Sequence, residues 1–157
     1  MQPDEAKRNS GKRIVLLIVT GLVIAFIFAQ SLLPKSVSAG ESGWLAEHVV
    51  NPLLRLFGVD VFGDHIARKI AHVAEFSVLA FLLTFCFRGQ IAKSAGAGFL
   101  TAFLDESLQL LSDRGALISD VWIDLIGIAI GVLFGVLIRK AILYHRRRKE
   151  ERRTYHS

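Results

Sequence analysis

Several features on which small soluble proteins depend are scarce or missing in this sequence. The 157 residues include one cysteine, Cys86, and three prolines. A single cysteine excludes a disulfide framework within the chain and a metal site built from several thiolates. No glycine-rich phosphate loop and no Gly-x-Ser-x-Gly nucleophile elbow occurs either. The sequence therefore contains none of these common motifs that would indicate nucleotide binding or serine-hydrolase activity.

The sequence is instead rich in long apolar blocks, and 52% of its residues are hydrophobic. Runs of about 20 apolar residues match the roughly 30 Å hydrocarbon layer of a bilayer. We therefore predict an all-α, polytopic membrane protein, an antiparallel bundle of four transmembrane helices. The expected spans cover residues of about 14–33, 70–87, 94–111 and 121–143. The short 88–93 link makes the second and third spans a tight antiparallel pair.

A cleaved signal peptide is the alternative interpretation of the first span, because Val37, Ser38 and Ala39 offer small residues at a cleavage site. Signal peptides usually have an apolar core of 7 to 15 residues, whereas this run is nearer to about 20. We therefore expect a retained helix and a four-helix membrane domain over residues 14–143, between basic tails at 1–13 and 144–157.

The distribution of Lys and Arg predicts the direction of the chain across the membrane. If both termini are cytoplasmic, fourteen of the nineteen basic residues lie inside: four in the amino-terminal tail, two in the 88–93 link and eight at the carboxyl end from Arg139 onward. This asymmetry is the one that cytoplasmic segments normally show. We attribute the net charge of +5 to topology and to anionic lipid headgroups at the basic tails, and expect no nucleic-acid partner.

The predicted outer segment between the first two spans is the longest connection in the chain. Its stretch from Trp44 to Phe57 mixes apolar and polar residues around Pro52. This composition suits a helix or loop at the level of the lipid headgroups, and proline disfavours one long helix. We interpret the segment as a connector that caps the bundle, with a lid that grips a substrate as the alternative.

Ionisable residues recur inside the predicted spans, although each costs a few kcal/mol at a helix centre. By helical rise they lie within about 10 Å of the outer helix ends, so the topology gathers them at one depth. We predict that they form an outer-face ligand-binding site. Its candidate residues are Arg68, Lys69, His72, Glu75, Asp105, Glu106, Gln109, Arg114, Asp120 and Asp124.

Glycines follow Asp124 along the last span at every fourth position. Gly127, Gly131 and Gly135 form a small-residue face of the kind that lets a neighbouring backbone approach closely. We expect this face to pack on another helix. Because Asp124 continues the same stripe, its carboxylate should point into the bundle.

The candidate site has a structural alternative, a buried salt-bridge network that fixes helix register. We expect no metal or other cofactor, because His72 is the only histidine in the group and His72-x-x-Glu75 reverses the Glu-x-x-His order of di-iron bundles. Whether the protein is an enzyme stays open. If it catalyses a reaction, His72 with Glu75 or Glu106 is the candidate acid/base pair.

Three ordered motifs carry a family resemblance. They are Arg68-Lys69-Ile-Ala-His72-Val-Ala-Glu75-Phe76, Asp105-Glu106-Ser-Leu-Gln109, and Arg114-Gly115 followed by Asp120-Val-Trp-Ile-Asp124-Leu-Ile-Gly127. Together they resemble the VanZ-like family of small bacterial membrane proteins. The resemblance implies a location in the bacterial plasma membrane, and the founding member is associated with resistance to the lipoglycopeptide teicoplanin.

The leading functional hypothesis is recognition or modification of a cell-envelope component at the outer face, such as a lipid-linked or lipoglycopeptide ligand. Arg68, Lys69 and Arg114 would meet its anionic groups, and the carboxylates would accept hydrogen bonds from hydroxyls or amines. Two alternatives are a small proton- or ion-coupled transporter, and a structural or partner-binding membrane protein. An oligomer is compatible with each.

Overall fold

The described part of the chain is entirely helical apart from one turn. The computed structural model describes residues 3–32, 48, 64–111 and 118–154, and no strand occurs in them. Its helices are α1 (Pro3–Leu32), α4 (Asp64–Cys86), α5 (Ile91–Leu111) and α6 (Ile118–Thr154). The predicted all-α fold is confirmed. The predicted interfacial stretch from Trp44 to Phe57 lies outside the described residues, except for His48.

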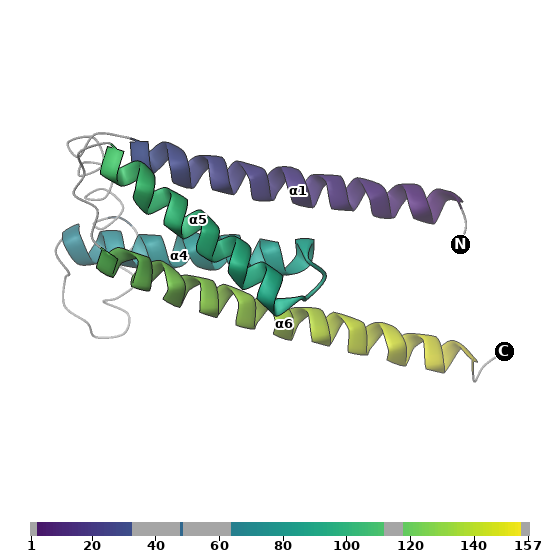
Figure 1. The fold of residues 1–157 in the computed structure, drawn as a ribbon. Helices are drawn as coiled ribbons and strands as arrows, with labels where there is room; N and C mark the ends of the chain where they lie inside the picture. Colours follow the sequence, from purple (N-terminus) through teal and green to yellow (C-terminus); the bar gives the residue numbers. More distant parts are fainter. Residues whose placement is uncertain (1–2, 33–47, 49–63, 112–117, 155–157) are drawn as a thin grey trace.

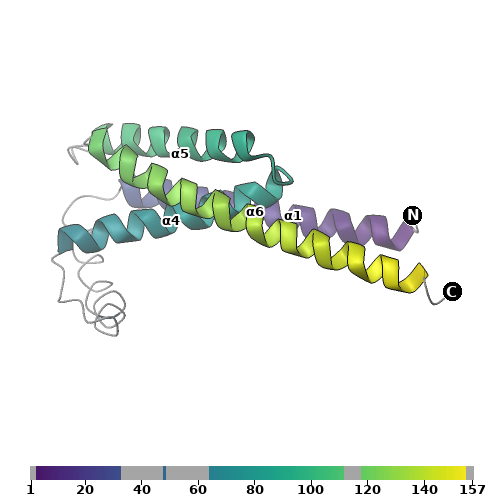
Figure 2. The ribbon, with the colours of Figure 1, turned by 90° about the horizontal axis from the view of Figure 1, so that it is seen from below.

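The helices run roughly along one common direction (Figures 1 and 2). Both termini lie at the same end, where α1 and α6 extend beyond the turn that joins α4 to α5 (Figure 1). The end of α1, the start of α4, the end of α5 and the start of α6 gather at the opposite end. This arrangement places the carboxyl end of α5 at the same end of the bundle as the amino ends of α4 and α6.

Three of the described helices are long and apolar enough to cross a membrane: α1 over Ser10–Leu32, α4 over Lys69–Cys86 and α6 over Asp120–Lys149. The 21 residues of α5 span about 31 Å, which is also sufficient in length. Its apolar sequence is interrupted by three charged residues, Lys93, Asp105 and Glu106. Both acids are buried, so they face other helices of the bundle.

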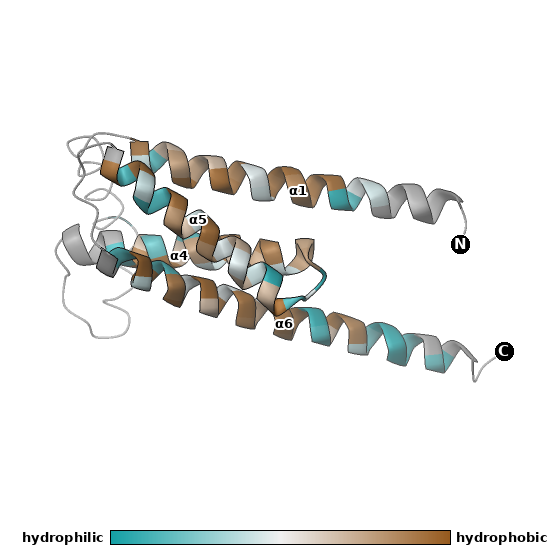
Figure 3. Cartoon of the chain, in the orientation of Figure 1, coloured by the Kyte–Doolittle hydropathy of each residue, from teal (hydrophilic) through white to brown (hydrophobic). Residues whose placement is uncertain are grey.

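The bundle has an apolar exterior and a partly polar interior. Leu22 of α1, Phe103 of α5 and Leu133 of α6 are more than half exposed, while Thr84 and Ser94 are fully buried. Apolar residues dominate the middle of the helices, and the far end of α6 becomes hydrophilic (Figure 3). Lipid tails would cover such a surface, as expected for membrane helices whose polar groups face inward.

The interface between α4 and α6 is the most extensive in the bundle. It is close because α6 presents glycines to the backbone of α4. A Cβ atom on Gly127 would lie 2.6 Å from the carbonyl oxygen of Val73, and one on Gly131 would overlap the carbonyl oxygen of Ser77. The Ser77 hydroxyl also donates to the Gly127 carbonyl across this interface, at 3.0 Å. Close backbone approach thus fixes α6 against α4.

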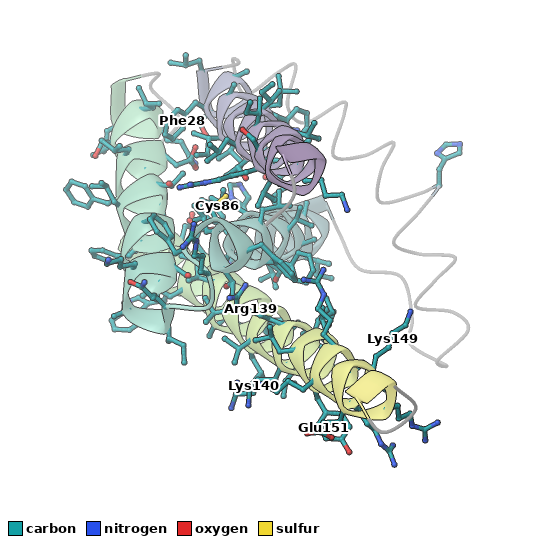
Figure 4. The ribbon with its side chains drawn as sticks, turned by 90° about the vertical axis from the view of Figure 1, so that its right-hand side faces the viewer. Phe28, Cys86, Arg139, Lys140, Lys149 and Glu151 are labelled. Carbon is teal, nitrogen blue, oxygen red and sulfur yellow. The ribbon has the colours of Figure 1, made fainter. Side chains whose placement is uncertain are left out.

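The turn after α4 brings α5 back at once. Arg88 and Gly89 have positive φ angles of 56° and 83°, and the Gly89 amide donates to the Thr84 carbonyl at 2.7 Å. This left-handed helix end is typical of glycine. A Cβ on Gly89 would come within 2.8 Å of the Arg139 side chain of α6, which is labelled in Figure 4. The turn therefore also packs against α6.

Candidate functional site

Three polar side chains from three different helices meet inside the bundle. They are His72 of α4, Asp105 of α5 and Asp124 of α6, and their nitrogen and carboxylate oxygen atoms lie within 4.8 Å of one another. Asp105 is completely buried and Asp124 is 2% exposed. Each residue lies roughly 9–12 Å along its helix from the end opposite the chain termini. The fold thus gathers these residues at one depth.

Asp105 is held by hydrogen bonds to both of its oxygens. The Ser31 hydroxyl of α1 donates to Oδ1, and Gln109 Nε2 donates to Oδ2 at 2.9 Å. Gln109 is one turn further along α5, so its bond orients the carboxylate from within the same helix. The Ser31 bond brings α1 to the site, which therefore receives side chains from all four described helices.

The sequence prediction did not include Ser31. A signal was present, because Gln30 and Ser31 are the last polar residues within the otherwise apolar first span and lie at the depth of the other candidates. A hydroxyl is inexpensive in a membrane helix, since it can bond a carbonyl of its own helix. A serine in a membrane helix is therefore a weaker indication of a functional site than a charged residue is.

His72 and Asp124 face each other across the α4–α6 interface. His72 Nδ1 lies 3.5 Å from Asp124 Oδ1, and the imidazole stacks on Phe76 with ring centroids 6.5 Å apart. The His72 side chain is 34% exposed, in contrast to the buried carboxylate. The histidine therefore forms the accessible side of the cluster.

The remaining candidates differ in how closely they join this group. Glu75, one turn after His72 on α4, is close enough to interact electrostatically with His72, Asp105 and Asp124. Glu106 is buried on α5 next to Asp105. Asp120 interacts electrostatically with Asp124.

The basic candidates are less completely described. Lys69 is partly buried near the start of α4. The backbone of Arg68 belongs to α4, but its side chain is not among those that the structure describes. Arg114 lies outside the described residues. The described structure therefore gives the positions of the acidic residues and the histidine, and the functional roles of all the candidate residues stay predictions.

Ser77 and Ser107, the two serines considered as nucleophiles, are engaged with backbone carbonyls. Ser77 donates to Val73 O at 2.6 Å, and Ser107 donates to Phe103 O at 2.7 Å. This back-bonding is common for helical serines and does not activate a hydroxyl as a nucleophile. The chemistry that the cluster offers is instead proton exchange, hydrogen bonding and cation binding by His72 and the carboxylates.

Comparison with known proteins identifies the family of this chain. A Bacillus subtilis (strain 168) protein named "Uncharacterized membrane protein YwnJ" is 39% identical over 84 residues, which are 54% of this chain and 54% of that protein. The chain thus spans about half the length of this curated relative. No solved structure matches. The family model described as VanZ/LLP1 matches residues 14–139, a range that contains His72, Asp105 and Asp124. The resemblance to the VanZ-like family is confirmed, and the chain belongs to the VanZ/LLP1 family.

Proposed function

We propose that this protein binds or modifies a component of the bacterial cell envelope at the outer face of the plasma membrane, and that this activity raises tolerance to teicoplanin. The proposed site is the cluster of His72, Asp105 and Asp124, with Glu75 and Glu106 beside it. The observation that carries the proposal is the meeting of a partly exposed histidine with two buried carboxylates at one depth, on three helices of a membrane bundle.

A functional role explains this concentration of charge better than a structural role does. Ionisable groups inside a membrane are costly, and a few neutral hydrogen bonds suffice to hold helices together. The α4–α6 interface already has close glycine packing and the Ser77 hydrogen bond. The partial exposure of His72 opens the cluster to a ligand, and carboxylates beside an imidazole are suited to bind hydroxyl or amine groups.

The charge distribution supports an outer location for the cluster. The cluster lies at the end of the bundle away from both termini, whereas Lys140 and Lys149 project from the terminal part of α6 (Figure 4). The positive-inside rule favours a cytoplasmic position for that basic part. The resemblance to the VanZ-like family implies that the membrane in question is the bacterial plasma membrane.

The basic end also offers a place for an anionic lipid. A cavity of about 200 Å³ between α1 and α4 is lined by Lys12, Arg13 and Arg88 together with apolar residues. Cations beside apolar side chains suit a phosphate headgroup with its acyl chain. We therefore include anionic phospholipid among the proposed partners.

Cysteine labelling would test the proposed topology. In a Cys86→Ser background, Glu151→Cys should react with a membrane-impermeant maleimide only after the cells are lysed, because Glu151 is exposed on the basic end of α6. Ser42→Cys, in the predicted outer segment, should react in intact cells. The reverse pattern would put the cluster on the cytoplasmic side and contradict an outer-face function.

Drug susceptibility would test the function itself. Expression in a sensitive bacterium should raise the inhibitory concentration of teicoplanin severalfold, and Glu75→Gln or Glu106→Gln should abolish the increase by removing a site carboxylate. Vancomycin, measured in parallel, would show whether the effect is specific to teicoplanin. Glu151→Gln is the matched control, since it removes an exposed carboxylate at the opposite end of the bundle from the cluster.

The susceptibility experiment requires equal amounts of each variant in the membrane. If wild type leaves teicoplanin tolerance unchanged, the resistance link is wrong for this protein, and the transporter and structural alternatives are preferred. If Glu106→Gln instead lowers stability and the envelope phenotype persists, the cluster serves the fold alone. These outcomes separate a binding site from a salt-bridge network.

A further inference from the structure

We propose that His72, Asp105 and Asp124 bind one divalent transition-metal ion, Zn²⁺ or Mn²⁺. This inference goes beyond the proposed function, because it concerns the cluster itself and stands whether or not teicoplanin tolerance changes. The sequence argued against a metal because the region has only one histidine. The structure adds to that histidine one carboxylate from each of two other helices.

The spacing of the three side chains fits metal ligation. One nitrogen or oxygen atom of each lies within 4.8 Å of those of the other two, and His72 Nδ1 is 3.5 Å from Asp124 Oδ1. Ligands bound to Zn²⁺ at 2.0–2.1 Å are roughly 3.3 Å apart along a tetrahedral edge. An ion between His72 and Asp124 therefore requires only small adjustments of the side chains.

Asp124 gives a second, independent indication. It is 2% exposed, and its Oδ1 accepts no hydrogen bond from the described part of the chain. The 3.5 Å to His72 Nδ1 is at the limit for a hydrogen bond, and a buried carboxylate oxygen normally has a closer partner. A metal ion would provide that partner from the side on which His72 and Asp105 lie.

The surroundings of Asp105 resemble the outer shell of a metal site. The Ser31 and Gln109 side chains donate to its two oxygens and so fix the orientation of the carboxylate. Hydrogen bonds of this kind accompany metal-binding carboxylates and tune their affinity. Since each carboxylate oxygen has two lone pairs, accepting these bonds leaves capacity for a metal.

The donor set narrows the class of ion. One imidazole and two carboxylates suit Zn²⁺ and Mn²⁺, whereas Mg²⁺ and Ca²⁺ prefer oxygen ligands alone and Cu⁺ prefers sulfur. Two carboxylates, a neutral imidazole and a dication sum to zero charge. A neutral site is the form that a low-dielectric membrane interior tolerates best. Glu75, nearby on α4, adds negative potential that would attract a cation.

Metal analysis of the full-length protein would test this proposal. Protein purified in detergent with a histidine-free affinity tag should contain about one Zn²⁺ or Mn²⁺ per chain by mass spectrometry. His72→Ala and Asp124→Asn should lower this content at least about tenfold. His145→Ala and Glu151→Gln are the matched controls, because they remove the same types of group from exposed positions of α6 and should keep the metal.

Chelation of the wild-type protein tests the site without any change to the sequence. Chelator treatment should lower the midpoint of thermal unfolding, and ZnCl₂ or MnCl₂ should restore it while MgCl₂ does not. Wild type that contains no metal and responds to neither salt would overturn the proposal. So would folded His72→Ala and Asp124→Asn proteins with wild-type metal content. Metal content and drug susceptibility are separate measurements, so failure of the resistance link would leave this result unaffected.

Discussion

Gly131→Ala should destabilise the bundle by about 2–3 kcal/mol, although it adds only one methyl group. That methyl group would overlap the carbonyl oxygen of Ser77 and lie 2.9 Å from the Cβ of Ala80. A backbone carbonyl within a helix cannot move aside as the end of a flexible side chain can. We therefore expect α6 to shift away from α4, with loss of packing along the whole interface.

Gly21→Ala is the matched control, because a Cβ at Gly21 of α1 would meet nothing within 4 Å. Alanine also favours helix more than glycine does, so this substitution should leave stability unchanged or slightly raised. Thermal unfolding of both variants in the same detergent, followed by circular dichroism, gives the comparison. Equal stability of the Gly131→Ala and wild-type proteins would mean that the close α4–α6 approach does not contribute to the fold.

The helices and the glycine stripe could be read from the sequence because both depend on local spacing. Apolar runs of bilayer length fix where helices form, and the four-residue spacing of Gly127, Gly131 and Gly135 puts them on one face. Topology alone also brings the polar residues to one end of the bundle, since alternate helices run in opposite directions. None of these steps requires knowledge of how the helices are rotated against each other.

The contacts within the cluster could not be predicted, because they depend on how each helix is rotated about its own axis. Asp105 and Glu106 are adjacent in sequence, and only the rotation of α5 about its axis brings Asp105 to His72 and Asp124. That rotation depends on packing among all the helices, including the approach of Ser31 from α1. A metal site is therefore less visible in this sequence than in proteins where two ligands share one helix at a fixed spacing.

The composition of α5 shows how the average polarity of a sequence differs from the arrangement of its polar and apolar residues in the structure. Asp105 and Glu106 interrupt the apolar sequence of α5, and this helix is not among the three that are long and apolar enough to cross a membrane. Both acids are buried, and the exposed residues of α5 include Phe99, Leu100 and Phe103. The sequence average mixes an apolar surface with a polar interior, and only the structure separates them.

Asp105→Ala should lower stability by about 2–4 kcal/mol, because it removes a buried carboxylate that accepts bonds from two helices. The Ser31 hydroxyl and the Gln109 amide would lose this acceptor in a region that water reaches poorly. Asp105→Asn should cost less, about 1 kcal/mol, since its amide oxygen can still accept one of the two bonds. Thermal unfolding in detergent that contains a chelator would measure these effects without any contribution from bound metal.

A double-mutant cycle with Ser31→Ala would show whether α1 is held to the site through this bond. Ser31→Ala alone should cost about 1 kcal/mol, and in an Asp105→Ala background it should cost almost nothing, because its partner is already gone. Additive losses would mean that Ser31 and Asp105 act independently and that α1 is held by apolar packing. A coupling of about 1 kcal/mol would instead make α1 part of the site, so that a ligand that displaces Ser31 from Asp105 would also loosen α1 from α5.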